Sequence, residues 1–194
     1  SASQKLNDES LKTLQNSWLK YKRKLVIFGV FPKNECLSEL ARRLANEPDV
    51  VVVAENLSNI AAEKVITQPE SLFSRINSKE KIDNFVPELV VTIGHSVICK
   101  QLKIFLRSHR PAEQWQIESS MPYIDTYKSL TTVIPGLATE VLNKMPFTTT
   151  ESEFSASYQT EMKQINQLHD EFIKNAFISD MAVTIELLSQ IPAD

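Results

Sequence analysis

The sequence predicts an α/β domain: a Rossmann-like, three-layer arrangement with a mainly parallel sheet of five or six strands, helices on both faces and further C-terminal helices. Apolar runs of strand length, rich in β-branched residues, occur at 25–31, 50–54 and 89–93, as is typical of strands buried on both faces. Segments with apolar residues at helical spacing alternate with these runs, and the links are short. This order is typical of parallel strands joined by right-handed crossovers.

The first part of the chain predicts helices on either side of the first strand. Apolar residues at helical spacing predict one helix over 11–21 and another from Cys36 to about Asn46. The basic run Lys22-Arg23-Lys24 follows the first helix, and we expect it to be a solvated helix end, because cations suit a helix C-terminus.

The middle and later parts of the chain predict broken helices and two further strands. Residues 61–86 are expected to be helical in pieces, interrupted by Pro69 and by Asn77-Ser78. Polar and apolar residues alternate over 114–118, as in a strand with one exposed face, and 131–134 predicts a last short strand.

The stretch from Pro87 to Lys100 predicts a strand, a turn and the start of a helix at one edge of the sheet. Gly94 allows a sharp turn after the strand at 89–93. We expect Ser96 to cap the helix that follows. The packed face of this helix is predicted to carry Ile98, Leu102, Phe105 and Leu106. Lys100 would then project from the first turn, at the edge where open parallel sheets bind ligands.

The C-terminal part predicts a short helix over 137–142 and a change of composition at Pro146. A long amphipathic helix over 158–173 and another helix beyond Ser179-Asp180 follow. We therefore divide the chain into a Rossmann-like domain, 1–147, and a segment, 148–194, that contains a linker helix and the start of a further domain.

Composition excludes several classes of function. Only three glycines occur among the 194 residues, which excludes a GxGxxG or Walker phosphate loop. The formal net charge of −3 argues against a nucleic-acid-binding surface. No apolar run is long enough to span a membrane, and no signal peptide opens the chain. Cys36 and Cys99 form no CxxC pair and are expected to be reduced thiols of a cytoplasmic protein. Because the chain opens on Ser1, we expect it to be part of a longer protein.

Side chains that could carry chemistry are few. The three histidines have no metal-ligand spacing, and no serine has the glycine neighbours of a nucleophile elbow, so we expect no catalytic, metal-binding or cofactor-binding residue in this segment. His95 follows a strand and is expected to satisfy a loop backbone. Lys100 is the exception, because a lysine beside free N–H groups at a helix start can hold a carboxylate. The alternative is an ordinary surface lysine.

Three stretches carry a resemblance to a known family: Pro87 to Gly94 with the helix start at Lys100, Glu55-Asn56-Leu57-Ser58, and Ile178-Ser179-Asp180-Met181-Ala182. The chain resembles the central domain of the 2-succinyl-5-enolpyruvyl-6-hydroxy-3-cyclohexene-1-carboxylate synthases of menaquinone biosynthesis, which are thiamine-diphosphate enzymes. The resemblance covers roughly residues 10 to 194, and other thiamine-diphosphate enzymes carry a similar central sheet.

The resemblance implies a cytoplasmic transferase that decarboxylates 2-oxoglutarate on thiamine diphosphate and magnesium and adds the succinyl semialdehyde unit to isochorismate. It implies N- and C-terminal domains in the same chain that hold the cofactor, and a homo-oligomer, dimer or tetramer. Of the family's substrate-binding basic residues, only Lys100 is matched in this segment. Some members have arginine at the next position, where this chain has Gln101, which alters the local charge.

Two functions of different class follow. In the first, the chain is the central domain of such a synthase, or of another thiamine-diphosphate enzyme, and is inactive alone. In the second, it is a free-standing Rossmann-like module that binds an acidic small molecule. The order of the strands cannot be predicted from the sequence.

Overall fold

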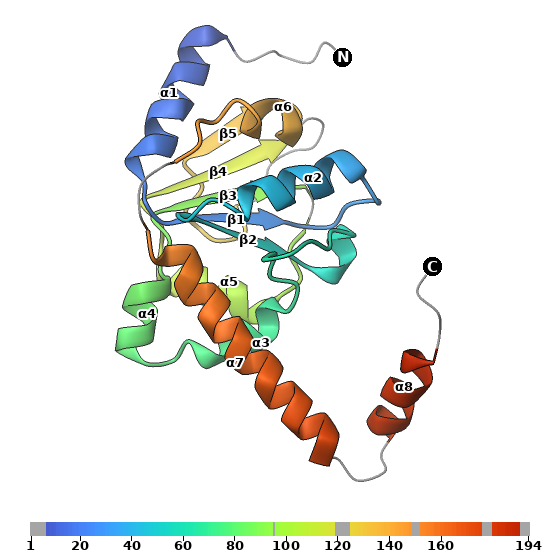
Figure 1. The fold of residues 1–194 in the computed structure, drawn as a ribbon. Coiled ribbons are helices and arrows are strands. Elements are labelled where there is room, and N and C mark those ends of the chain that lie inside the picture. The colour runs from blue at the N-terminus through green and yellow to red at the C-terminus, as the bar shows by residue number, and fades with distance from the viewer. Residues whose placement is uncertain (1–6, 95, 119–124, 149–151, 176–179, 191–194) are drawn as a thin grey trace.

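A single parallel sheet forms the centre of the molecule (Figure 1). The computed structural model describes residues 7–94, 96–118, 125–148, 152–175 and 180–190. Five strands pair in the order β2–β1–β3–β4–β5, and all four pairings are parallel. Their bounds are β1 Lys24–Phe28, β2 Val50–Ala54, β3 Leu89–Ile93, β4 Glu113–Glu118 and β5 Thr132–Pro135. This is the flavodoxin-like order of doubly wound sheets, and it confirms the predicted fold class.

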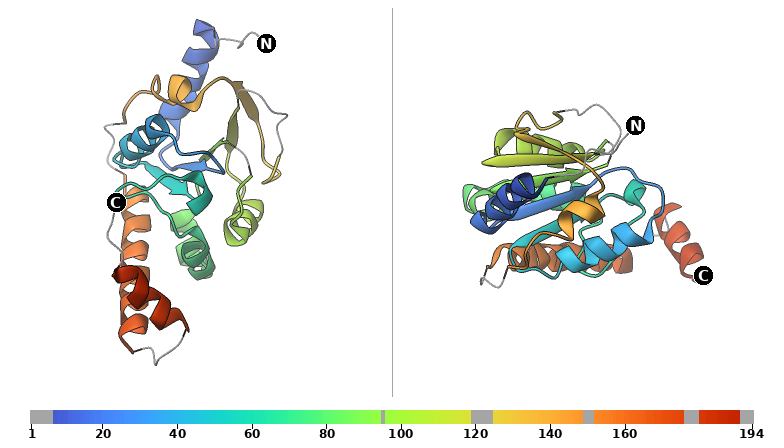
Figure 2. Two further views of the ribbon diagram at one scale, coloured as in Figure 1. Left: turned by 90° about the vertical axis from the view of Figure 1, so that its right-hand side faces the viewer. Right: turned by 90° about the horizontal axis from the view of Figure 1, so that it is seen from above.

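Helices cover both faces of the sheet and complete three layers (Figure 2). One face carries α1 (Asp8–Lys20), α2 (Glu35–Leu44) and α6 (Ala138–Leu142). The other carries α3 (Pro69–Arg75), α4 (Lys79–Phe85), α5 (Lys100–Ser108) and α7 (Phe154–Asn175). A short 3₁₀ turn, η1 (Asn56–Ser58), follows β2, and α8 (Asp180–Ser189) comes after α7. None of the described helices is both long and apolar enough to cross a lipid bilayer.

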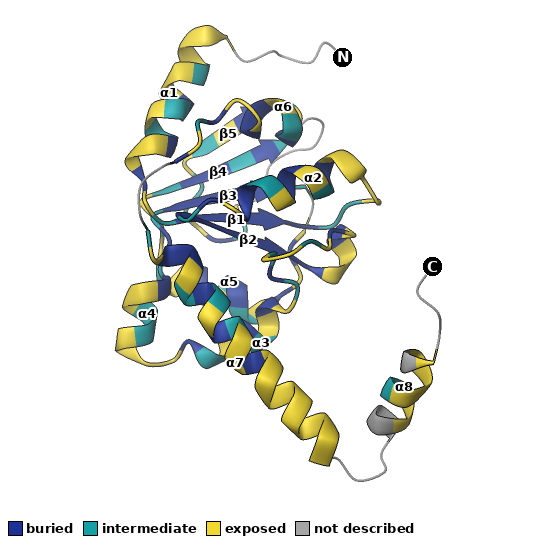
Figure 3. Ribbon diagram, viewed as in Figure 1, coloured by how far each residue is buried: buried dark blue, intermediate teal, exposed yellow. Residues whose placement is uncertain are grey.

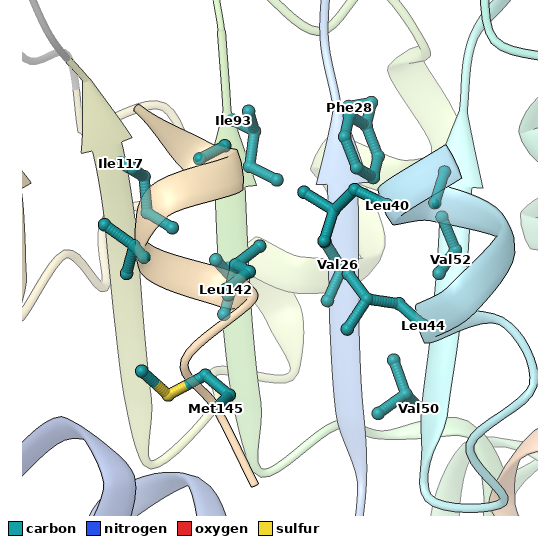
Figure 4. Close-up of a cluster of buried hydrophobic side chains, with 14 of the residues drawn as sticks. Val26, Phe28, Leu40, Leu44, Val50, Val52, Ile93, Ile117, Leu142 and Met145 are labelled. Carbon is teal, nitrogen blue, oxygen red and sulfur yellow. The ribbon is translucent and has the colours of Figure 1, made fainter. Parts of the chain in front are cut away.

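The strands β1, β2 and β3 are buried along their whole length, as the dark ribbon in Figure 3 shows. Successive side chains of a strand point to opposite faces, so β1 contributes to two hydrophobic clusters. Val26 and Phe28 pack on the side of α2, where Leu40 and Leu44 meet them (Figure 4). Leu25 and Ile27 belong to the cluster on the α5 side. The apolar runs were recognisable as strands because both faces are covered.

Two local predictions are wrong. Lys24 is the first residue of β1 and is fully buried, not solvated, because its ammonium group pairs with the buried carboxylate of Asp49. Residues 61–68 are not helical. Ile66 instead forms a parallel bridge with Val53 and exchanges backbone hydrogen bonds with the edge strand β2, which gives its side chain a buried position.

The first half of α7 packs against the body of the molecule, and its second half extends away from it (Figure 3). The Tyr158 hydroxyl donates to the carbonyl oxygen of Phe85 at 2.7 Å. The carboxylate of Glu161 accepts from Arg75 Nε at 2.8 Å and from Lys81 Nζ at 2.9 Å. Beyond Ile165 every described residue of α7 is exposed. The proposed boundary between 147 and 148 stays a prediction, and residues 178 and 179 of the resemblance lie outside the described residues.

Candidate functional site

The carboxyl edge of the sheet is where ligands bind in open α/β folds, at the point where the strand order reverses. Here that point lies between β1 and β3. Gly94 follows β3 with a φ of +79°, and a Cβ added to it would overlap the ring of Phe31, which follows β1. The N–H of Phe31 donates to the carbonyl of Leu57 at 3.0 Å. The Phe31 ring therefore occupies the position beside Gly94, which confirms that a residue without a side chain is required there.

A cavity of about 590 Å³ opens beside this crevice, between the loop after β2, the start of α3 and the start of α5. Its volume falls within the range of small-molecule sites. The lining residues are Glu55, Asn56, Leu57, Thr67, Gln68, Pro69, Glu70, Ser71, Ile98, Cys99 and Lys100. A larger hollow of about 710 Å³ lies between α1 and the strands β4 and β5, away from this edge. We take the cavity at the carboxyl edge as the candidate site because of its place in the sheet.

Lys100 is at the predicted place, as the first residue of α5 and on the wall of this cavity. Its side chain is exposed, and it forms no hydrogen bond or ion pair with the described part of the chain. The predicted cap is wrong, because Cys99, not Ser96, precedes the helix, and its Sγ accepts from the N–H of Leu102 at 3.3 Å. Ile98 also differs from the prediction, since it precedes the helix and is 55% exposed.

The N–H groups at the start of α5 are already bound by carboxylates of the chain itself. Glu55 is buried, and its Oε2 and Oε1 accept from the N–H groups of Ile98 at 2.7 Å and Cys99 at 2.5 Å. Oε2 of Glu70 accepts from Cys99 Sγ at 3.1 Å and from the N–H of Gln101 at 3.4 Å. The expectation that free N–H groups would assist Lys100 therefore does not hold at these three positions.

Two further groups near the cavity are unreactive. Burial, with the neighbouring carboxylates of Glu70 and Glu55, raises the pKa of the Cys99 thiol to about 12, although the Leu102 N–H acts in the opposite direction. The thiol stays protonated at neutral pH and is a poor nucleophile. The Tyr127 hydroxyl is buried with no hydrogen-bond partner among the described residues, and burial raises its pKa. Cys36 is a free, exposed thiol on α2 and does not line this cavity.

The sequence predicted the place of Lys100 correctly, whereas its role stays a prediction, and the sequence assigned no role to Glu55 or Glu70. Glu55 follows β2 directly, and the end of the apolar run at 50–54 indicates its position at the carboxyl edge. Its hydrogen bonds to residues more than forty positions away have no local signal. His95 lies outside the described residues.

Comparisons with known proteins give a consistent result. A family model described as "Middle domain of thiamine pyrophosphate" matches residues 2–194. A 2-succinyl-5-enolpyruvyl-6-hydroxy-3-cyclohexene-1-carboxylate synthase of Porphyromonas gingivalis is 29% identical over 201 positions, which cover 98% of this chain and 34% of that protein. Synthases of the same name from Cytophaga hutchinsonii and Christiangramia forsetii are 25% and 31% identical, over 97% and 60% of this chain and 33% and 21% of their own lengths. The chain thus spans about a third of the relatives that it matches throughout.

Proposed function

The chain belongs to the family of middle domains of thiamine pyrophosphate enzymes, and from this premise we propose that it is the central part of a 2-succinyl-5-enolpyruvyl-6-hydroxy-3-cyclohexene-1-carboxylate synthase. The observation that carries the proposal is that relatives with this name match almost the whole chain, including its C-terminal helices. The activity would then belong to a protein about three times as long as this segment.

The proposed reaction removes CO₂ from 2-oxoglutarate and transfers the succinyl semialdehyde unit to isochorismate, as a step of menaquinone biosynthesis. Thiamine diphosphate with magnesium would supply the stabilisation of negative charge that this chemistry needs. The described residues do not fit that cofactor, since they contain no group of three His, Cys, Asp or Glu arranged for a metal, and the sequence lacks a glycine-rich phosphate loop. We therefore assign the cofactor to N- and C-terminal domains of the longer polypeptide, assembled as a cytoplasmic dimer or tetramer.

Lys100 is the residue of this segment to which we assign substrate binding. Both substrates carry carboxylates, and the Lys100 ammonium stands at the carboxyl edge without an internal partner among the described residues. An exposed cation contributes little on its own, whereas one shielded by neighbouring domains would form a charge-assisted bond. The carboxylates of Glu55 and Glu70 are engaged by N–H and S–H donors, which leaves the ammonium available to a ligand.

Replacing Lys100 in the intact enzyme tests this role. We expect Lys100→Ala to lower kcat/KM about tenfold, since the loss of one charge-assisted bond changes a binding constant by about that factor. Lys100→Arg should recover only part of the loss, because a planar fork does not reproduce a compact ammonium. Lys103→Ala is the matched control, because Lys103 lies on the same helix but does not line the cavity. Unchanged kinetics for both substrates in Lys100→Ala would show an ordinary surface lysine.

Experiments on the isolated segment test whether the cofactor is bound by other domains of the longer polypeptide. We expect calorimetry to detect no binding of thiamine diphosphate to residues 1–194, and no turnover of the two substrates, because the groups proposed to hold the cofactor lie elsewhere. Micromolar binding of the cofactor to this segment would contradict the assignment. An open reading frame that continues into a Gly-Asp-Gly motif followed by an asparagine would support it, and a stop codon after Asp194 would favour a free-standing module.

A further inference from the structure

The two residues before Lys100 are hydrogen-bonded to the residue after β2, a strand that does not pair with β3. Ile98 and Cys99 precede α5, and their N–H groups donate to the two different oxygens of one carboxylate, that of Glu55, at 2.7 and 2.5 Å. Glu55 directly follows β2, which is separated from β3 by β1. The backbone before Lys100 follows β3, on one side of the point where the strand order reverses, and these bonds fix it to the end of β2 on the other side.

A second carboxylate holds the residues on both sides of Lys100. Glu70, in the first turn of α3, accepts from the thiol of Cys99 at 3.1 Å and from the N–H of Gln101 at 3.4 Å. Two carboxylates, one directly after β2 and one in α3, thus hold the backbone around Lys100. The side chain of Lys100 itself forms no hydrogen bond or ion pair with the described residues. A binding group on a fixed backbone loses less freedom when a ligand arrives.

We propose that Glu55 is a positioning residue, whose carboxylate holds the turn 98–99 so that the Lys100 ammonium faces the cavity at the carboxyl edge. The inference deepens the proposed function and rests on the role assigned there to Lys100. Glu55 is suited to this task because it is only 7% exposed and both of its oxygens bind backbone N–H groups. Its charge is satisfied by the backbone, so it does not need to capture the lysine as an ion-pair partner.

A double-mutant cycle in the intact enzyme separates positioning from general structural support. We expect Glu55→Ala to raise the KM of the carboxylate substrate that Lys100 binds by about tenfold, and Glu55→Ala with Lys100→Ala to be no worse than Lys100→Ala alone. This follows because a displaced lysine and an absent lysine are equivalent. If the two losses multiply, or if Glu55→Ala leaves KM unchanged, the proposal is overturned.

Amide hydrogen exchange provides a readout that does not depend on activity. In this chain, Glu55→Gln should accelerate exchange of at least one of the Ile98 and Cys99 amides by about tenfold, because one of the two accepting oxygens is replaced by an NH₂ group that cannot accept. The amides of β3 should be unchanged. Glu63→Gln is the matched control, since Glu63 is an exposed glutamate that follows the same strand.

The two measurements distinguish the ways in which the proposals can fail. Unchanged kinetics for both substrates in Lys100→Ala would remove the substrate role of the lysine and, with it, the positioning role of Glu55. An effect of Lys100→Ala together with unchanged amide exchange in Glu55→Gln overturns the positioning role alone. Glu55→Gln retains the size of the side chain, so it keeps the test valid if Glu55→Ala does not fold.

Discussion

Charged groups are held differently at the carboxyl edge of the sheet, where the strands end, and at the amino edge, where they begin. At the carboxyl edge, the carboxylates of Glu55 and Glu70 bind N–H and S–H donors beside an open cavity, and Lys100 is exposed. At the amino edge, Lys24 and Asp49 form an ion pair with no exposed side-chain surface. The Lys100 ammonium therefore has no partner among the described residues, whereas the charges of Lys24 and Asp49 are paired inside the fold.

At the amino edge, some buried polar atoms have no hydrogen-bond partner among the described residues. Lys24 Nζ, besides its pairing with Asp49, lies 3.4 Å from Thr148 Oγ1 and 5.0 Å from the centre of the Trp18 ring. Asp49 Oδ1 and Glu47 Oε2 are buried without a hydrogen-bond partner among the described residues. Burial lowers the pKa of Lys24, although its bond to Asp49 acts against this.

The largest effect is expected from breaking the buried pair. Asp49→Ala leaves Lys24 as an uncompensated buried cation and should reduce the free energy of unfolding by about 3–5 kcal/mol, measured by urea denaturation. Glu39→Ala is the control, because the Glu39–Arg42 pair is exposed and should contribute less than about 1 kcal/mol. Similar losses in the two variants would show that the amino edge is solvated in solution.

Glu47 makes the stability of the amino edge depend on pH. Burial and the nearby Asp49 raise its pKa from 4.5 to about 7, while Arg43, Lys24 and the backbone N–H of Thr148 act in the opposite direction. As pH rises from 4.5 to 7, the unfolded chain releases this proton before the folded chain does, so stability falls. The ionised group then destabilises the fold by about 3 kcal/mol above pH 8.

Glu47→Gln should therefore stabilise the protein by up to about 3 kcal/mol at pH 8 and have almost no effect at pH 4.5. Urea denaturation at the two pH values measures the difference, and Glu63→Gln, an exposed position, should show no such dependence. An equal effect of Glu47→Gln at both pH values would exclude titration of Glu47 as its cause.

The sequence predicted features that leave a local pattern and could not predict those that depend on residues far apart in the chain. The apolar runs predicted the strands, because burial on both faces leaves a local pattern in β1, β2 and β3. The pairing of Lys24 with Asp49 joins residues 25 positions apart, so the basic run could not indicate a buried lysine. The strand order and the hydrogen bond from the Ile98 N–H to the Glu55 carboxylate are likewise set by tertiary packing.

At the carboxyl edge, close packing is expected to matter more than charge. Gly94→Ala should destabilise the protein by about 2–3 kcal/mol, because φ is +79° and the new Cβ would overlap the Phe31 ring. Gly136→Ala is the comparison, since its φ is also positive, at +139°, but its nearest neighbour would be 3.7 Å away. If Phe31→Ala recovers none of the loss caused by Gly94→Ala, the overlap with the ring is not its source.

The smallest effect on stability is expected at Lys100, and comparing it with Lys24 tests the distinction between the two edges directly. Lys24 is fully buried and paired, so Lys24→Ala leaves the Asp49 carboxylate buried alone and should cost several kcal/mol. Lys100 is exposed and unpaired among the described residues, so Lys100→Ala should change the free energy of unfolding by less than about 0.5 kcal/mol. Both are measured by urea denaturation of the same chain. A loss above about 1 kcal/mol in Lys100→Ala would mean that this lysine supports the fold, and a kinetic defect of the variant could then no longer be attributed to substrate binding.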